Sequence, residues 1–140
     1  MPQPIPYLSF NGNCKEAMQF YETALLGKLQ AMLTFGETPM ANQCAAAELD
    51  QICHACLVFP DGGMLYAGDC QKSVPYEGIK GVSITLNYLT IDEATRAFAA
   101  LGVGGTVIMP MEPAFWAKTF GMLVDRFGTP WIINGESIPL

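Results

Sequence analysis

The chain has 140 residues, of which 51% are hydrophobic and 14% charged, and its formal net charge is −6. This composition is typical of one domain, or two closely packed half-domains, and excludes a disordered chain. The seven lysines and arginines are scattered singly, which argues against a nucleic-acid partner because phosphate backbones are bound by clustered cations. No apolar stretch is long enough to cross a bilayer and the N-terminus shows no secretory signal, so we expect a cytoplasmic protein with no membrane partner.

The first half of the chain is predicted to form a β-α-β-β-β module. A short strand at 7–10 precedes an amphipathic helix, for which Asn13 is the expected N-cap, Glu16 its capping-box partner and Gly27 the left-handed C-cap. A long irregular segment at 36–51 is expected either to cover a pocket or to serve only as a connection. The three strands expected after the helix are 28–35, 52–59 and 64–70.

The second half repeats this order after a strand at 82–88. Its helix is predicted to begin at Thr90, with Glu93 as the capping-box partner. Between the next two strands, the loop 112–118 carries two large aromatic residues, Phe115 and Trp116. The three strands expected after this helix are 104–111, 120–126 and 130–134.

The repetition itself predicts the architecture. We expect an α+β fold of paired β-α-β-β-β modules, about 1–72 and 80–140 with a linker at 73–79, together forming a single domain over 1–140. Two such modules usually face each other and enclose a concave space, which is where we expect the functional site.

The run Cys53-His54-Ala55-Cys56 has the spacing of a metal clip but lies inside a predicted strand. Side chains alternate between the two faces of a strand, so the two thiols should point in opposite directions and a structural zinc site is not expected. Five cysteines in a chain without an export signal favour free thiols. His54 is the one histidine of the chain, either a catalytic or orienting group in the cavity or a core residue.

Other polar and aromatic residues are candidates for ligand contacts, each with a structural alternative. Asp69, near the end of its strand, is expected to accept a hydrogen bond from a ligand or a protein group, or to lie in water, and we favour the solvated alternative. The aromatic candidates either form the wall of an apolar site or plug the edge of the core. Asn134 either fastens the end of the chain or faces the cavity, and Asn87 and Tyr88, at the end of the strand 82–88, have the same two alternatives. The complete set of ligand-binding candidates is Tyr88, Phe115, Trp116, Trp131 and Asn134.

The segment 115–134, with its Phe120-Gly121, Phe127-Gly128 and Pro130-Trp131 pairs, closely resembles the PhnB-like family. So does the N-terminal Tyr7-Leu-Ser-Phe-Asn-Gly-Asn13 run, and the resemblance covers nearly the whole chain. That family belongs to the vicinal oxygen chelate superfamily. The resemblance implies the glyoxalase/bleomycin resistance/dihydroxybiphenyl dioxygenase-like fold, and it implies a homodimer.

The resemblance also bears on metals and cofactors. In metal enzymes of the superfamily, one ligand comes from the first strand and one from the last strand of each module. Those positions correspond here to residues that cannot bind a cation, so we expect neither a metal nor another cofactor. The inherited family label, 3-demethylubiquinone-9 3-methyltransferase, is not supported by any glycine-rich S-adenosylmethionine motif. The four corresponding positions are Pro6, Leu65, Val82 and Ile132.

These observations predict a protein that binds a small organic molecule between its modules without a metal. Aromatic side chains would hold the ligand, while His54, Asp69 and Asn134 would orient it. The first alternative is a cofactor-independent isomerase, lyase or hydrolase that uses His54, assisted by Asp69, as acid or base. Methyl transfer is the weakest alternative.

Overall fold

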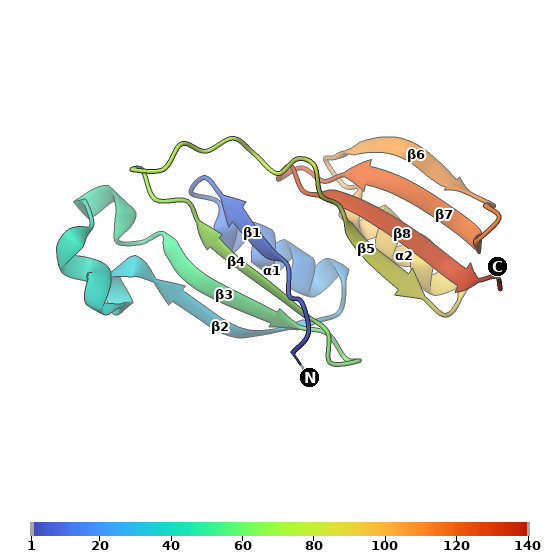
Figure 1. Ribbon diagram of the computed structural model, residues 1–140, viewed down its shortest axis with the longest axis horizontal. Coiled ribbons are helices and arrows are strands. Elements are labelled where there is room, and N and C mark those ends of the chain that lie inside the picture. Colours follow the sequence, from blue (N-terminus) through green and yellow to red (C-terminus); the bar gives the residue numbers. More distant parts are fainter. Residues whose placement is uncertain (1, 140) are drawn as a thin grey trace. The chain divides into compact units, whose positions relative to one another are not determined.

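The computed structural model describes residues 2–139. The chain divides into two compact units, Met1–Gly78 and Ile79–Leu140, and each unit contains one four-stranded sheet and one α-helix (Figure 1). The two sheets and their helices confirm the predicted α+β class and the β-α-β-β-β order of each module. Within residues 2–139, neither helix has the length and apolar character needed to span a membrane.

The first unit has the strand order β1-β4-β3-β2, in which β1 runs parallel to β4 and the other neighbours are antiparallel. Helix α1 packs against β2, β3 and β4 and covers one face of this sheet. Alternate strand residues face the helix: Phe10 of β1 is fully buried and contacts the ring of Tyr21 in α1. The elements are β1 (Tyr7–Phe10), α1 (Cys14–Ala24), β2 (Lys28–Thr34), β3 (Ile52–Val58) and β4 (Met64–Asp69).

Both predicted caps of α1 are wrong. Asn13 occupies the N-cap position, but its side chain makes no capping hydrogen bond. At the other end, Leu26 has the left-handed conformation, with φ of 56°, and Gly27 does not. Gly27 instead lies where the chain approaches β3 closely: a Cβ on this residue would lie 3.0 Å from the Leu57 side chain and 3.1 Å from the carbonyl oxygen of Val58. A side chain here would therefore be tightly packed against β3.

The predicted irregular segment after β2 contains three short 3₁₀ helices, Phe35–Glu37, Pro39–Gln43 and Ala46–Glu48. Its ends are joined by backbone hydrogen bonds from Phe35 N to Gln51 O and from Gly36 N to Leu49 O. The segment is thus a loop between β2 and β3 whose two ends are hydrogen-bonded to each other.

The second unit repeats the arrangement with the strand order β5-β8-β7-β6, β5 being parallel to β8. Here the predicted cap of the helix is confirmed: the Thr90 hydroxyl accepts a hydrogen bond from Glu93 N (3.1 Å), and the Glu93 carboxylate accepts one from that hydroxyl (2.9 Å). Proline at position 110 is tolerated in β6 because this strand lies at the edge of the sheet. The elements are β5 (Ile84–Tyr88), α2 (Ile91–Leu101), β6 (Thr106–Glu112), β7 (Ala117–Val124) and β8 (Pro130–Ser137).

Candidate functional site

Helix α2 packs on β5, β7 and β8, which leaves the opposite face of the second sheet without a helix of its own unit. Two glycines identify the covered face. A Cβ on Gly135 would lie 2.7 Å from the Ala94 side chain of α2, and one on Gly121 would lie 2.7 Å from the ring of Phe98. Side chains alternate along a strand, so Phe120 and its alternate neighbours point to the uncovered face.

A chain of hydrogen-bonded side chains crosses this uncovered face. The indole Nε1 of Trp116 donates to Oδ1 of Asn134 (3.0 Å), and Nδ2 of Asn134 donates to Oδ1 of Asn87 (2.9 Å). Strand register places these groups together, because Asn134 of β8 pairs with Asn87 of β5 on one side and with Phe120 of β7 on the other. We call Asn87, Trp116, Phe120 and Asn134 the Trp116 cluster.

Aromatic contacts fix the orientation of the indole further. The ring of Trp116 meets that of Phe120 edge-on, with centroids 4.9 Å apart, and Phe115 meets Trp116 edge-on at 4.7 Å. Phe115 itself is 76% exposed, at the turn between β6 and β7. The hydrogen bond and these ring contacts together restrain the orientation of the indole.

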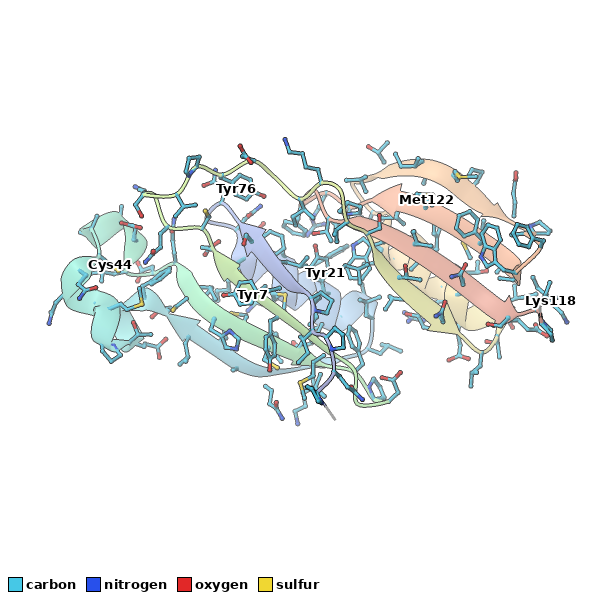
Figure 2. The ribbon with its side chains drawn as sticks, viewed as in Figure 1. Tyr7, Tyr21, Cys44, Tyr76, Lys118 and Met122 are labelled. Carbon is cyan, nitrogen blue, oxygen red and sulfur yellow. The ribbon has the colours of Figure 1, made fainter. Side chains whose placement is uncertain are left out.

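The Trp116 cluster has an ionic and an apolar neighbour along the strands. On one side, Lys118 and Glu136 form an ion pair with a 2.7 Å N–O distance, both side chains being about half exposed. On the other side, Ile132 of β8 pairs with Met122 of β7 and with Thr85 of β5. Figure 2 shows Met122 and Lys118 on the same strand, β7. The cluster thus lies between a neutralised charge pair and a mostly apolar strip.

Three of the five predicted ligand contacts are not part of the cluster. Phe115 borders it through its ring contact with Trp116. Trp131 is 1% exposed in the core of the second unit, where its indole donates to Oδ2 of Asp125 (2.8 Å). Asp125 also accepts hydrogen bonds from the backbone N–H groups of Phe127 and Thr129. Through Asp125, this tryptophan anchors the β7–β8 turn. Tyr88 pairs with Gly135 at the end of β5, one residue beyond Asn87 and therefore on the opposite side of the strand.

On the uncovered face of the first sheet, His54 is flanked by two tyrosines. Its ring lies 4.9 Å from that of Tyr66, edge-on, and 6.1 Å from that of Tyr7, roughly stacked. The Tyr7 hydroxyl donates to the carbonyl oxygen of Cys53 (3.1 Å), and burial raises the pKa of this phenol. Gly68 makes room for this bond, since a Cβ there would lie 2.5 Å from the hydroxyl. Within residues 2–139, no carboxylate lies within ion-pair distance of His54.

The solvated environment favoured for Asp69 is wrong. This carboxylate is 7% exposed and accepts three backbone hydrogen bonds, from Gly12 N (2.9 Å), Cys14 N (3.0 Å) and Ile52 N (2.8 Å). It therefore serves the free N–H groups at the start of α1, the role expected of Asn13. The thiol of Cys14 lies in the same place, and burial, with a smaller effect from the charge of Asp69, raises its pKa to about 12.

Among residues 2–139, no group of three or more His, Cys, Asp or Glu residues is placed to hold a metal ion. Of the four positions that correspond to metal ligands in the superfamily, Leu65 is 1% exposed in the core of the first unit. The uncovered sheet faces carry phenols and amides instead, notably Tyr7, Tyr66 and Asn134, and these are weak ligands for a divalent metal.

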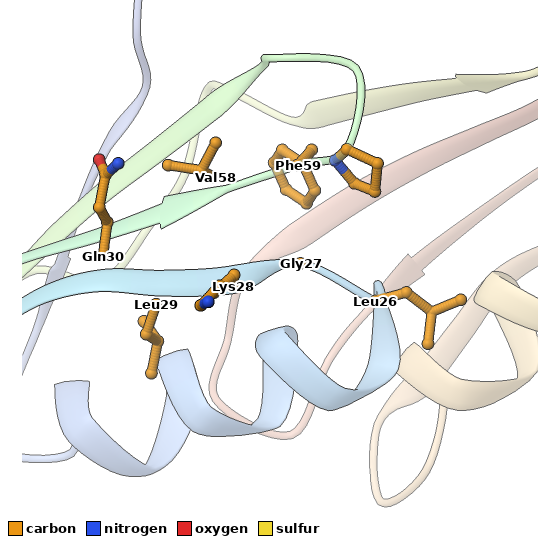
Figure 3. A pocket seen from close by; sticks show the side chains of 8 residues that line it. Leu26, Gly27, Lys28, Leu29, Gln30, Val58 and Phe59 are labelled. Carbon is orange, nitrogen blue, oxygen red and sulfur yellow. The ribbon is translucent and has the colours of Figure 1, made fainter.

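The first unit also has a surface hollow of about 440 Å³ beside the end of α1 (Figure 3). It lies between the beginning of β2 and the end of β3, and none of the predicted catalytic or ligand-binding residues lines it. Its wall is mostly apolar, with Lys28 and Gln30 as its polar side chains.

Sequence reasoning found Trp116 and Asn134, and it raised Asn87 as a residue that either fastens the chain or faces the cavity, but it did not connect the three. Phe120 was not among the predicted contacts, and neither were Tyr7 and Tyr66 beside His54. Strand register brings these residues into place, and register between strands far apart in the chain leaves no local signal in a single sequence.

No family model matches the sequence. The chain is 33% identical over 139 residues to the protein YjdN of Escherichia coli strain K12, with 92% of each chain covered. It is 49% identical to protein PA1353 from Pseudomonas aeruginosa, with a TM-score of 0.90 over 97% of this chain and 98% of that one. A putative 3-demethylubiquinone-9 3-methyltransferase, PhnB protein, from Bacillus cereus shares the fold at 20% identity and a TM-score of 0.77, covering 96% of this chain and 99% of that one. The similarity to YjdN over 92% of both chains shows that this chain belongs to the same family as YjdN, and the structural neighbours show that it has the paired-module fold of glyoxalase/bleomycin resistance proteins.

Proposed function

We propose that the chain binds a small, uncharged or weakly polar organic molecule at the Trp116 cluster, without the help of a metal ion. One observation carries the proposal: an indole and two amides are hydrogen-bonded in a row on a sheet face that no helix of their own unit covers. Small-molecule sites combine apolar and aromatic walls with a few polar groups in fixed positions. Here the aromatic wall is Trp116 and Phe120, and the fixed polar groups are Asn87 and Asn134.

The proposal is supported by how firmly the groups are held. Binding is stronger when contacting side chains are ordered before the ligand arrives, because less conformational entropy is lost. Trp116 is restrained by one hydrogen bond and two edge-on ring contacts. Asn134 is restrained by partners on both sides.

A thermal-shift screen of a metabolite library, in buffer containing a chelator, tests this function. We expect at least one compound to raise the melting temperature of the wild type but not that of Trp116→Ala. Tyr76→Ala, which removes another partly exposed aromatic ring outside the cluster, is the matched control and should keep the response. If no compound stabilises the wild type, or if each one stabilises Trp116→Ala equally, the proposal fails.

A second candidate function is acid–base catalysis by His54 on a small carbonyl compound. The observation that favours it is the position of the imidazole between Tyr7 and Tyr66 on the uncovered face of the first sheet. An imidazole can remove a proton next to a carbonyl group near neutral pH. Solvent deuterium exchange into a panel of small ketones and aldehydes, followed by NMR, measures this activity directly. We expect exchange with the wild type and none with His54→Gln; equal rates for the two proteins would remove this candidate.

A further inference from the structure

We infer that the ligand of the Trp116 cluster is a planar, conjugated and uncharged carbonyl compound, whose oxygen accepts a hydrogen bond from the side-chain amide of Asn87. This inference rests on the proposed function and names the class of molecule that the cluster selects. It follows from the direction in which the hydrogen bonds of the cluster run.

The direction is set by the indole of Trp116. An indole N–H can only donate, so the atom of Asn134 that lies 3.0 Å from it must be the carbonyl oxygen. The amide nitrogen of Asn134 then faces Asn87, and the atom of Asn87 that it meets at 2.9 Å must be an acceptor, again the carbonyl oxygen. The ambiguity that usually attends the orientation of an asparagine amide is absent here.

The hydrogen-bonded row Trp116–Asn134–Asn87 therefore ends on a donor, the NH₂ group of Asn87. The carbonyl oxygens of Asn134 and Asn87 each already accept one hydrogen bond, whereas the NH₂ group of Asn87 has no protein partner among residues 2–139. Asn87 is exposed, so this NH₂ group is accessible. A ligand oxygen without a hydrogen satisfies it, while a ligand N–H group would leave donor facing donor.

The surface beside Asn87 determines the shape of the rest of the ligand. The next row on this face consists of Thr85, Ile132 and Met122. Each lies two residues along its strand from a member of the amide row, about 7 Å away at 3.3 Å per residue. Ile132 and Met122 are neighbouring apolar residues on this sheet face, and a flat apolar body can rest on both of them. A conjugated ring attached to the carbonyl group would lie on Ile132 and Met122 with one edge toward Trp116.

The charges nearby favour a neutral ligand over a carboxylate. Lys118, the cation nearest in register, is already paired with Glu136 at 2.7 Å. The whole chain carries a formal net charge of −6, which repels anions. A carboxylate would lose its hydration at the cluster without gaining a free cation.

Three matched naphthalenes test the inference by isothermal titration: 2-acetylnaphthalene, 2-isopropenylnaphthalene, in which a CH₂ group replaces the carbonyl oxygen, and 2-naphthoate. We expect the ketone to bind wild type about tenfold more tightly than the hydrocarbon, as one hydrogen bond implies, and more tightly than the carboxylate. The indole NMR signal that is missing in Trp116→Phe should shift when the ketone binds.

Asn87→Asp supplies the decisive variant, because an aspartate still accepts from Asn134 but has no N–H to offer. The ketone should lose its preference over the hydrocarbon in this variant and keep it in Asn11→Asp, which introduces the same charge at an exposed position of the first unit. Equal binding of ketone and hydrocarbon, an unchanged preference in Asn87→Asp, or no binding of any naphthalene overturns the inference. If library compounds still bind in a Trp116-dependent way, the proposed function stands without it; if none does, both fail.

Discussion

Asp69 shows how much one buried carboxylate can do in a small unit. Its two oxygens accept hydrogen bonds from the turn before α1, from the first residue of α1 and from the first residue of β3. These segments are far apart in the sequence, so nothing near Asp69 in the chain reveals the contacts. The alternation of apolar residues correctly predicted the strand that ends at Asp69, but not which backbone groups its side chain would meet.

Replacing Asp69 by alanine should lower the free energy of unfolding by about 3 kcal/mol or more, because backbone N–H groups at a buried site lose a charged acceptor. Urea denaturation measures the loss. Asp61→Ala is the matched control: Asp61 accepts a single hydrogen bond, from Gly63 N, at an exposed turn, and its loss should cost less than about 1 kcal/mol. Similar losses for the two variants would contradict the assigned role of Asp69.

Cys14 should be the slowest thiol of the chain to react. Burial and the charge of Asp69 raise its pKa to about 12, so at pH 8 almost all of it is the unreactive thiol form. The reactive thiolate gains population only as the pH approaches 12. Alkylation with iodoacetamide, followed by peptide mass spectrometry, should label the partly exposed Cys44 well before Cys14 in the folded protein. Labelling of Cys14 at an equal rate would show that its site is open.

The two helices differ in where their N-terminal hydrogen-bond acceptors come from: close in the sequence for α2, and from a distant strand for α1. In α2, Thr90 and Glu93 are three residues apart, and the Thr90 hydroxyl caps the helix as predicted, while the Glu93 carboxylate accepts a hydrogen bond from that hydroxyl. In α1, the same kind of pattern around Asn13 is present, but Asp69 of the last strand serves the N-terminus instead. Elements whose stabilising groups are close in the sequence were predictable, whereas those completed by a distant strand were not.

The candidate site follows the same rule. Trp116 and Asn134 were found because a loop tryptophan and a strand asparagine are unusual in themselves. Their link to Asn87 depends on the parallel register of β5 and β8, and the burial of Trp131 depends on which side of β8 faces α2. Period-two alternation shows that Trp131 and Asn134 lie on opposite faces but does not tell which face is covered.

Cap substitutions should therefore differ between the helices. Thr90→Ala removes the acceptor of the Glu93 backbone N–H and should destabilise the protein by about 1 kcal/mol. Asn13→Ala removes no capping hydrogen bond and should change the stability by less than about 0.5 kcal/mol. Urea denaturation of both variants makes the comparison, and an equal or larger loss for Asn13→Ala would show that its side chain does cap α1.

At the scale of the whole molecule, the edge strand β6 exposes apolar side chains on both of its faces. The consecutive residues Val107, Ile108 and Met109 are 50%, 54% and 46% exposed, so both faces of this strand present apolar groups. Exposed apolar edge strands tend to pair with another chain. We expect β6 to contribute to a homodimer, which is also the common state implied by the family resemblance.

Size-exclusion chromatography with light scattering should give a mass twice the 15.2 kDa of one chain. Ile108→Lys should shift the protein toward the monomer, because an edge lysine opposes pairing between strands. Leu89→Lys, at an apolar residue that is 88% exposed outside β6, should leave the mass unchanged. A monomeric wild type, or dissociation by Leu89→Lys alone, would exclude β6 as the contact.

The position of Asp69 at the far end of the first module has a consequence for synthesis on the ribosome. The nascent chain can wind its first helix early, but the carboxylate that fastens this helix and the parallel partner of β1 both belong to the last strand of the module. Until β4 has left the exit tunnel, the earlier segments lack their anchors. The amino-terminal half should therefore fold in one late step once that strand emerges, not progressively as it is translated.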